Sequence, residues 1–180
     1  LEKIIYGLYY DHSIDNLPDS VKYVRFDFMS NFNQKINKYP KMLEYICFGQ
    51  KFNQKIENLP QNLKTLSLRH SKCYDHNINK LPDSISILEL PYNVHEKNRK
   101  LFSIDRFPKS LKKLNFSATY AKNMPKYPDS LAILHTTYNN FDNLPNNIVF
   151  LELTIEKDTI INKLPNSLTT LIIYRTIGNG

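Results

Sequence analysis

The stretch Leu59-Pro60-Gln61-Asn62-Leu63-Lys64-Thr65-Leu66-Ser67-Leu68 contains the pattern that decides the fold, because the chain repeats it. In this stretch a proline follows an apolar residue, and further apolar residues stand three, six and eight places after the proline. The frame fits Pro18, Pro40, Pro60, Pro82, Pro108, Pro128, Pro145 and Pro165, and only Thr136 breaks it. Self-similarity at a period of about 20 residues is typical of repeat proteins, so we interpret residues 1–180 as a single repeat array of about nine turns.

The two irregular parts of the array are its start and its longest turn. Leu1, Ile4 and Tyr6 have the spacing that would follow a proline two residues before the chain begins, so we expect a truncated first turn with an uncapped apolar edge. The interval from Pro82 to Pro108 is the longest and contains the charged segment Val94–Lys100. This segment is either a functional insertion or a plain surface loop.

The spacing within one frame predicts a strand and a return without helices. Positions six and eight after the proline are two residues apart, so their side chains share one face of a strand. Apolar residues also stand one and four places before each proline, and an aromatic residue stands eight places before it in five copies, as in Leu59, Ile56 and Phe52. A proline in every turn and many Asn and Asp residues interrupt helical pairing. We therefore predict a mainly β solenoid with one short parallel strand per turn and non-helical return segments.

The repeated frame resembles two related kinds of repeat. Leu63-Lys64-Thr65-Leu66-Ser67-Leu68 resembles the Leu-x-x-Leu-x-Leu strand core of leucine-rich repeats. More narrowly, Phe32-Asn33-Gln34-Lys35-Ile36-Asn37-Lys38-Tyr39-Pro40 and Phe52-Asn53-Gln54-Lys55-Ile56-Glu57-Asn58-Leu59-Pro60 resemble FNIP repeats, which are found in amoebae and in giant viruses that infect them. The resemblance implies a leucine-rich-repeat-like solenoid. One departure is Ser71, which stands where leucine-rich repeats carry an asparagine, three places after the last strand leucine.

The same resemblance implies a function. Family members from such viruses often carry an amino-terminal F-box ahead of the repeats, which here would lie upstream of Leu1. The resemblance therefore implies the substrate-recognition arm of a ubiquitin-ligase adaptor, located in the host cytoplasm if the protein is viral.

Composition and charge favour an intracellular, cytoplasmic protein without a membrane segment. The formal net charge is +7, but the basic residues are spread along the chain, which is typical of a solvated surface. The densest clusters are Lys97-Asn98-Arg99-Lys100 and Lys112-Lys113. Neither a signal peptide nor an apolar run of membrane-spanning length is present. Cys47 and Cys73 lie in different phases of the frame and are expected to be free thiols in a reducing compartment.

No motif in the sequence indicates catalysis. The chain has only four glycines, so a glycine-rich phosphate loop is absent. His70, Cys73 and His76 form the one cluster with a tempting spacing, but a zinc site needs a fourth ligand, for which only Asp75 is near. We therefore predict a protein that is not an enzyme and that uses no cofactor and no metal.

The strands point instead to a binding surface. Residues five, seven and nine places after each proline are expected to project from the exposed face of the sheet, where apolar and aromatic groups run beside mixed charges. The predicted partner-binding residues are Tyr23, Arg25, Tyr45, Ile87, Glu89, Lys113, Ile133, His135, Phe150 and Glu152. We predict a protein–protein interaction module. The other interpretation of this face is that aromatic and β-branched residues simply favour strands.

Nucleic-acid binding is the alternative function. Glu89 and Glu152 would share the strand face with the aromatic residues and repel phosphates, so nucleic acid would have to bind basic loop residues such as Lys97, Arg99 and Lys100. The sequence does not indicate an oligomeric state.

Overall fold

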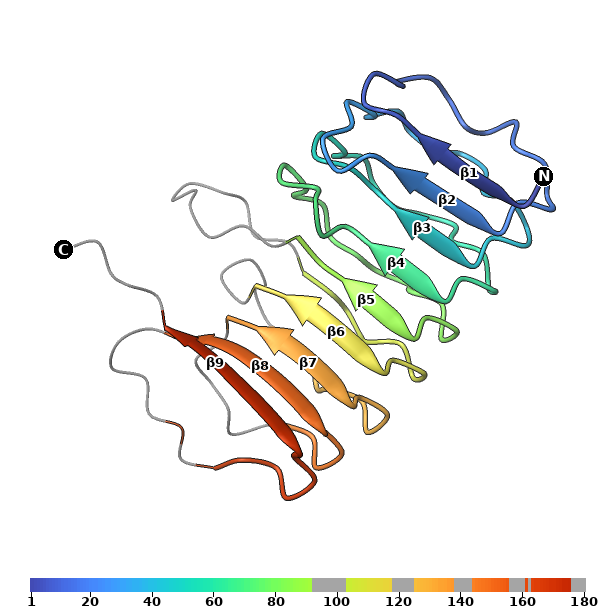
Figure 1. Ribbon diagram of the computed structural model, residues 1–180. Coiled ribbons are helices and arrows are strands. Elements are labelled where there is room, and N and C mark those ends of the chain that lie inside the picture. The colour runs from blue at the N-terminus through green and yellow to red at the C-terminus, as the bar shows by residue number, and fades with distance from the viewer. Residues whose placement is uncertain (92–102, 118–124, 138–143, 156–160, 162, 176–180) are drawn as a thin grey trace.

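A computed structural model describes residues 1–91, 103–117, 125–137, 144–155, 161 and 163–175 of the chain. Nine strands form one parallel sheet whose spatial order follows the chain order, as Figure 1 shows. The strands are β1 (Lys3–Tyr6), β2 (Tyr23–Phe26), β3 (Tyr45–Cys47), β4 (Thr65–Ser67), β5 (Ile87–Glu89), β6 (Lys113–Phe116), β7 (Ile133–Thr136), β8 (Phe150–Ile155) and β9 (Thr170–Arg175). The described ranges contain no helix, and so none that is long and apolar enough to cross a membrane. The predicted mainly β solenoid with non-helical return segments is confirmed.

A tight turn at each framing proline explains why the third residue after it is apolar. In all eight turns the backbone N–H of that third residue donates a hydrogen bond to the proline carbonyl, with N···O distances of 3.1–3.4 Å. Such a four-residue turn reverses the chain over a short length. It carries the third residue beneath the sheet, where Leu63 and Ile85 are fully buried. The strand then starts two residues after this apolar group.

The strands pair so that equivalent positions of successive turns lie side by side. Val24 pairs with Ile46, and Ile46 in turn pairs with Leu66. Because side chains alternate between the two faces of a strand, this register sorts the whole chain into inward and outward columns. The register is the same although the prolines recur every 17 to 26 residues, so the return segments absorb the variation in length.

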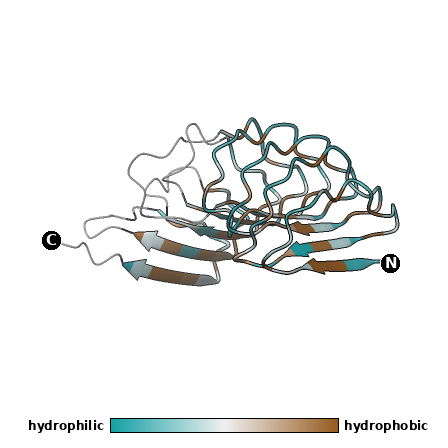
Figure 2. Ribbon diagram, turned by 90° about the horizontal axis from the view of Figure 1, so that it is seen from above, coloured by the Kyte–Doolittle hydropathy of each residue, from teal (hydrophilic) through white to brown (hydrophobic). Residues whose placement is uncertain are grey.

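The core lies between the strand layer and the return layer, which Figure 2 shows one above the other. The inward residues of β2 to β8 at position six are fully buried and belong to one continuous apolar cluster. The inward residues Leu171 and Ile173 of β9 are 37% and 46% exposed, because no strand pairs with the far side of β9 in the described part of the chain. At the opposite end Leu1 is 73% exposed, while Ile4 and Tyr6 pack against the cluster.

Stacked aromatic rings fill the amino-terminal half of this core. We define the aromatic stack as Tyr6, Tyr10, Phe26, Phe32, Phe48, Phe52 and Tyr74. Within one turn the two rings nearly touch, with centroids 4.1 Å apart for Phe26 and Phe32. Rings of neighbouring turns also stack, as Phe32 and Phe52 do at 6.0 Å. The aromatic residue eight places before each proline thus serves the core, and these pairs stabilise the packing beyond the burial of their area.

A ladder of polar side chains connects the return segments. Asp11 Oδ1 accepts the backbone N–H of Asn33, Asn33 Oδ1 accepts that of Asn53, and Asn53 Oδ1 accepts that of Asp75, at 2.8, 2.8 and 3.1 Å. Each member follows directly after an aromatic residue of the stack, as in the dipeptides Phe32-Asn33 and Phe52-Asn53. This return ladder gives the backbone N–H groups of three successive turns a side-chain acceptor in the turn before.

Candidate functional site

The face of the sheet turned away from the return segments carries two parallel columns of side chains. The apolar column holds the residues at position five, which are Tyr23, Tyr45, Thr65, Ile87, Lys113, Ile133, Phe150 and Thr170. The polar column holds those at position seven, which are Arg25, Cys47, Ser67, Glu89, Asn115, His135, Glu152 and Ile172. We call this surface the open sheet face. All ten residues predicted to bind a partner lie in these two columns, so the structure brings them together on one surface.

The apolar column begins with a rigid aromatic pair. The rings of Tyr23 and Tyr45 stack with centroids 4.2 Å apart and an angle of 5° between their planes. Lys3 Nζ lies 4.8 Å from the centroid of the Tyr23 ring, a distance at which a cation is attracted to the ring face. From Tyr23 to Phe150 the members of this column are half-buried, because neighbours one strand apart cover one another.

The polar column is more deeply buried than the sequence predicted. Cys47, Ser67 and Asn115 are only 7%, 1% and 8% exposed, so the prediction that all outward positions project freely is wrong for them. Position nine differs in the same way, because Pro91 and Ser117 are also buried. The reason is spacing: outward side chains on adjacent strands stand about 4.8 Å apart, so long neighbours cover short ones. Burial also raises the pKa of the Cys47 thiol, which disfavours the reactive thiolate.

Two hydrogen-bonded pairs occupy the middle of the polar column and leave one residue between them. Ser67 Oγ donates to Glu89 Oε2 at 2.7 Å, and His135 Nδ1 lies 3.0 Å from Glu152 Oε2. Asn115 stands between the two pairs, because it is in register with Glu89 on one side and with His135 on the other. Its side-chain oxygen is buried and has no hydrogen-bond partner among the described residues.

A small cavity of about 150 Å³ opens beside Asn115. We call it the polar-column pocket; Arg69, Asn115, His135, Thr136, Glu152 and Thr154 line it. His135 and Glu152 were predicted from the sequence, whereas Asn115 and Arg69 were not. No sequence signal marks Asn115, because a polar residue at an outward strand position looks the same whether or not its neighbours pair with it. Arg69 stands at position nine of its frame, and only its place on the same strand face could have suggested it.

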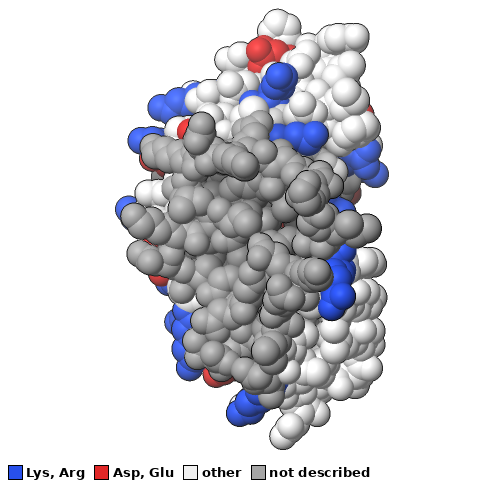
Figure 3. Space-filling model, turned by 90° about the vertical axis from the view of Figure 1, so that its left-hand side faces the viewer, with Lys and Arg blue, Asp and Glu red and all other residues white. Residues whose placement is uncertain are grey.

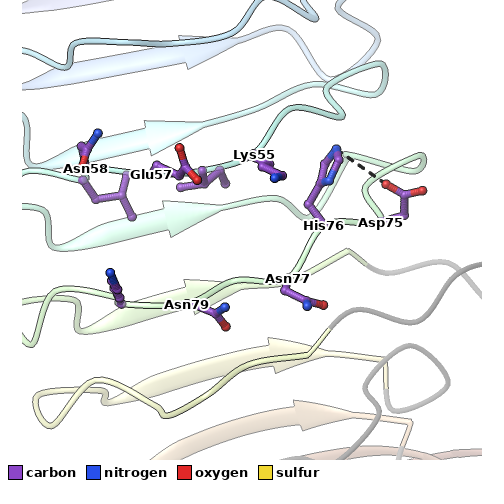
Figure 4. A pocket seen from close by; sticks show the side chains of 10 residues that line it. Lys55, Glu57, Asn58, Asp75, His76, Asn77 and Asn79 are labelled. Carbon is purple, nitrogen blue, oxygen red and sulfur yellow. Dashed lines mark ion pairs between the residues drawn. The ribbon is translucent and has the colours of Figure 1, made fainter.

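A second, larger cavity of about 490 Å³ lies between two return segments (Figure 4). Residues 55–59 form one wall and residues 75–80 form much of the other. His76 Nε2 lies 3.1 Å from the carbonyl oxygen of Asn53 and 3.7 Å from Asp75 Oδ1. The backbone takes positive φ angles of 55° at Asn58 and 57° at Lys80, a conformation that bends each wall. The lining is polar, and its Lys55, Glu57, Asp75 and Lys80 side chains balance in charge.

The described residues bring no metal site together. Within them, no group of three or more His, Cys, Asp or Glu side chains is arranged to hold a metal ion. His70 instead has its ring centroid 6.1 Å from that of Phe28, and burial lowers its pKa. Cys47 and Cys73 are free cysteines.

Basic side chains do not form one patch among the described residues on the side of the molecule drawn in Figure 3. Figure 3 shows Lys and Arg scattered over the side of the molecule that it presents, with Asp and Glu among them. The loop residues Lys97, Arg99 and Lys100, on which the nucleic-acid alternative depends, lie outside the described residues. On the open sheet face, Glu89 and Glu152 lie in the same column as Arg25.

Comparisons with known proteins agree with this architecture. The family model described as FNIP Repeat matches residues 32–71, the segment that contains β3 and β4. The fold is similar to that of CroV588, whose crystal structure is described as a novel circular LRR protein structure, with a TM-score of 0.68 and 24% sequence identity. This similarity covers 98% of the chain and 31% of CroV588, so the chain spans about a third of that protein. None of the curated proteins matches the sequence. The chain therefore has a leucine-rich-repeat-like fold and matches the FNIP repeat over residues 32–71.

Proposed function

We propose that the chain is a protein-interaction module that binds its partner with the open sheet face. The observation that carries this proposal is the apolar column, in which the large side chains of Tyr23, Tyr45, Ile87, Ile133 and Phe150 lie in one register, with Thr65 and Lys113 among them. Tyrosine and phenylalanine are enriched at protein interfaces, and rings that are already fixed lose little freedom on binding. The stacked pair of Tyr23 and Tyr45 is such an anchor, and the polar column beside it supplies hydrogen-bonding groups and charge.

The finer role that we propose is the substrate-recognition arm of a ubiquitin-ligase adaptor that acts in the cytoplasm. One observation supports it: residues 32–71 match the FNIP repeat, and residues 32–40 and 52–60 within them resemble repeats that often follow an F-box. A repeat array suits this task because its stacked turns present one extended surface. The carboxylates of Glu89 and Glu152 on that surface favour a protein partner over nucleic acid.

Replacing the large members of the apolar column tests the proposal. A variant with Tyr23→Ser, Tyr45→Ser and Phe150→Ser should lose the partners that the parent chain captures from the native cell, as measured by pull-down and quantitative mass spectrometry. A matched control replaces three exposed apolar residues outside both columns, with Tyr9→Ser, Met42→Ser and Val149→Ser. The control should capture the same partners as the parent.

The folded state and the alternative function are checked in parallel. Both variants should keep the circular dichroism spectrum of the parent, since none of the six side chains is fully buried. If the column variant captures its partners as well as the control does, the open sheet face is not the binding surface. Micromolar affinity for an oligonucleotide at about 200 mM salt would favour the nucleic-acid alternative instead, because nonspecific phosphate contacts weaken steeply with salt.

A further inference from the structure

The polar-column pocket has an unpaired amide at its edge. Asn115 is only 8% exposed, and its side-chain oxygen Oδ1 has no hydrogen-bond partner among the described residues. A buried acceptor without a donor is costly to fold, so such a group points to a partner that arrives later. The χ2 torsion of asparagine is soft, so a donor inside the pocket can draw this oxygen toward it.

The opposite wall of the pocket offers further acceptors. His135 Nδ1 lies 3.0 Å from Glu152 Oε2, a distance that suits an N–H donated by the ring to the carboxylate. When the neutral ring donates from Nδ1, its Nε2 is an acceptor. Glu152 also keeps lone pairs, because a carboxylate has about four acceptor positions. Three groups of the pocket lining can therefore accept a hydrogen bond from an N–H group of a ligand: Asn115, His135 and Glu152.

Arg69 adds donors and a positive charge. It is exposed, it lines the pocket, and it forms no ion pair with any described residue. Its guanidinium carries five N–H donors and no acceptor. The pocket thus combines a carboxylate at Glu152 with a guanidinium at Arg69, within a volume of about 150 Å³.

These groups select the chemistry of the ligand. A carboxylate would be attracted by Arg69 but repelled by Glu152, and an ammonium or guanidinium group would be attracted by Glu152 but repelled by Arg69, so a neutral polar group suits the pocket better than either charge. An apolar side chain would leave Asn115 unpaired, and a hydroxyl has one hydrogen to share between Asn115 and Glu152. A carboxamide has two N–H donors for these acceptors and a carbonyl oxygen for Arg69. A volume about five times the 30 Å³ share of one liquid water is sufficient for a carboxamide and its methylene groups.

We propose that the polar-column pocket receives a carboxamide side chain, that of Gln or Asn, presented by the protein partner. The inference rests on the proposed function only for the source of this side chain, because the pocket's chemistry is a property of the chain alone. It therefore assigns to Asn115 and Arg69 a role in choosing the partner.

Amino-acid probes test the proposal without a known partner. The full chain, labelled with ¹⁵N, is titrated with the methyl ester of N-acetyl-glutamine, whose one primary carboxamide is the side chain, and the backbone signals of His135 and Glu152 are followed by NMR together with the side-chain amide of Asn115. We expect saturable shifts with an apparent affinity about tenfold higher than for the matched glutamate, lysine and norleucine probes. Asn115→Leu should abolish the saturation.

Two further variants keep the test decisive. Glu152→Gln removes the repelling carboxylate and should let the glutamate probe saturate, so the proposal is testable even if Asn115→Leu does not fold. Tyr23→Ser with Tyr45→Ser lies on β2 and β3, away from the pocket, and should leave glutamine-probe binding unchanged. Loss of partner capture in this double variant concerns the proposed function alone. Saturation by the glutamate or lysine probe in the parent chain, or by no probe at all, would overturn the carboxamide assignment.

Discussion

At the scale of single residues, Gly49 is a position with no room for a side chain. A Cβ atom built there would lie 2.3 Å from the Asp27 carbonyl oxygen and 2.7 Å from Ser30 Cβ. Its backbone φ is not positive, so the glycine is needed for this close approach between turns and not for a special backbone conformation. Ser71 Oγ also donates to the Gly49 carbonyl at 3.1 Å, which fixes the same strip of backbone from the next turn.

Gly49→Ala should therefore destabilise the fold by about 1–3 kcal/mol, the usual cost of forcing an extra methyl group into a packed site. This loss of stability is measured as the difference in the free energy of unfolding in urea between the variant and the parent. Gly7→Ala is the matched control, because a Cβ at Gly7 meets nothing within 4 Å, and its unfolding should stay within about 0.5 kcal/mol of the parent. Equal urea midpoints for the two variants would contradict the close approach at Gly49.

Residue-level prediction from the sequence succeeded for the core and failed for contacts between turns. Leu63, Leu66 and Leu68 are predicted to be inward by spacing alone, and all three are fully buried. The role of Gly49 could not be predicted, because the atoms that exclude a side chain belong to Asp27 and Ser30 in the preceding turn. Asn115 was missed for the same kind of reason, since its isolation depends on where Glu89 and His135 direct their own hydrogen bonds.

At the scale of elements, the return ladder is the device that aligns the non-helical segments. Asn53 is a central member: its backbone N–H donates to Asn33 Oδ1, and its own Oδ1 accepts the N–H of Asp75. Asn53→Ala should cost about 1 kcal/mol, because it leaves the half-buried Asp75 N–H without this acceptor. Amide hydrogen exchange gives a local measurement, in which the Asp75 amide should lose protection while that of Leu66 in β4 keeps it.

The control for the ladder is Asn31→Ala. Asn31 is exposed and precedes the ladder position by two residues, and its side chain forms no hydrogen bond that the structure describes. It should leave both the unfolding free energy and the exchange of Asp75 unchanged. If Asn31→Ala lost as much unfolding free energy and as much Asp75 amide protection as Asn53→Ala, the ladder would not be what aligns the return segments.

The elements themselves were predictable where the frame is regular. The positions of β2 to β7 follow from the proline and the apolar slots six and eight places later. Thr136 breaks the apolar pattern, yet it pairs in register between Phe116 and Leu153, because the neighbouring strands fix its place. The return ladder was not predicted, although its signal was an Asn or Asp directly after four of the five aromatic residues that stand eight places before a proline. Read as an isolated dipeptide, Phe-Asn indicates only a turn, and the hydrogen bond it makes lies about 20 residues away.

At the scale of the whole molecule, buried tyrosines couple folding to alkaline pH. Burial raises the pKa of Tyr39 and Tyr74 above the ordinary tyrosine value, and burial with the neighbouring Tyr10 raises that of Tyr6 to about 12. An unfolded tyrosine ionises near pH 10, whereas these folded ones stay neutral to higher pH. Their contribution to stability is therefore complete below pH 10 and is lost as pH rises through the folded values.

The urea midpoint should consequently change little from neutral pH to about pH 8.5, fall slightly above it because burial also raises the pKa of the Cys47 thiol, and fall more steeply from about pH 10 toward pH 12. The Tyr39→Phe variant should have a urea midpoint that falls less steeply with pH, because a tyrosine whose pKa is raised in the folded state has been removed. At neutral pH it should be at least as stable as the parent, since the Tyr39 hydroxyl is buried and has no hydrogen-bond partner in the described ranges. Two results would contradict this account. One is a urea midpoint of the parent chain that does not fall above about pH 10, and the other is a lower urea midpoint for Tyr39→Phe than for the parent at neutral pH.

The aromatic stack has a spectroscopic consequence. The chain has no tryptophan, so its near-ultraviolet circular dichroism comes from tyrosine and phenylalanine. Seven closely spaced rings lie between Tyr6 and Tyr74, while the described carboxyl-terminal half adds the pair of Phe107 and Tyr127 at 5.8 Å. The near-ultraviolet signal therefore reports on side-chain packing around such rings, and the far-ultraviolet signal reports on the peptide groups of every turn. Melting curves from the two wavelength ranges coincide if the array unfolds as one unit, and their separation measures how far cooperativity extends from turn to turn.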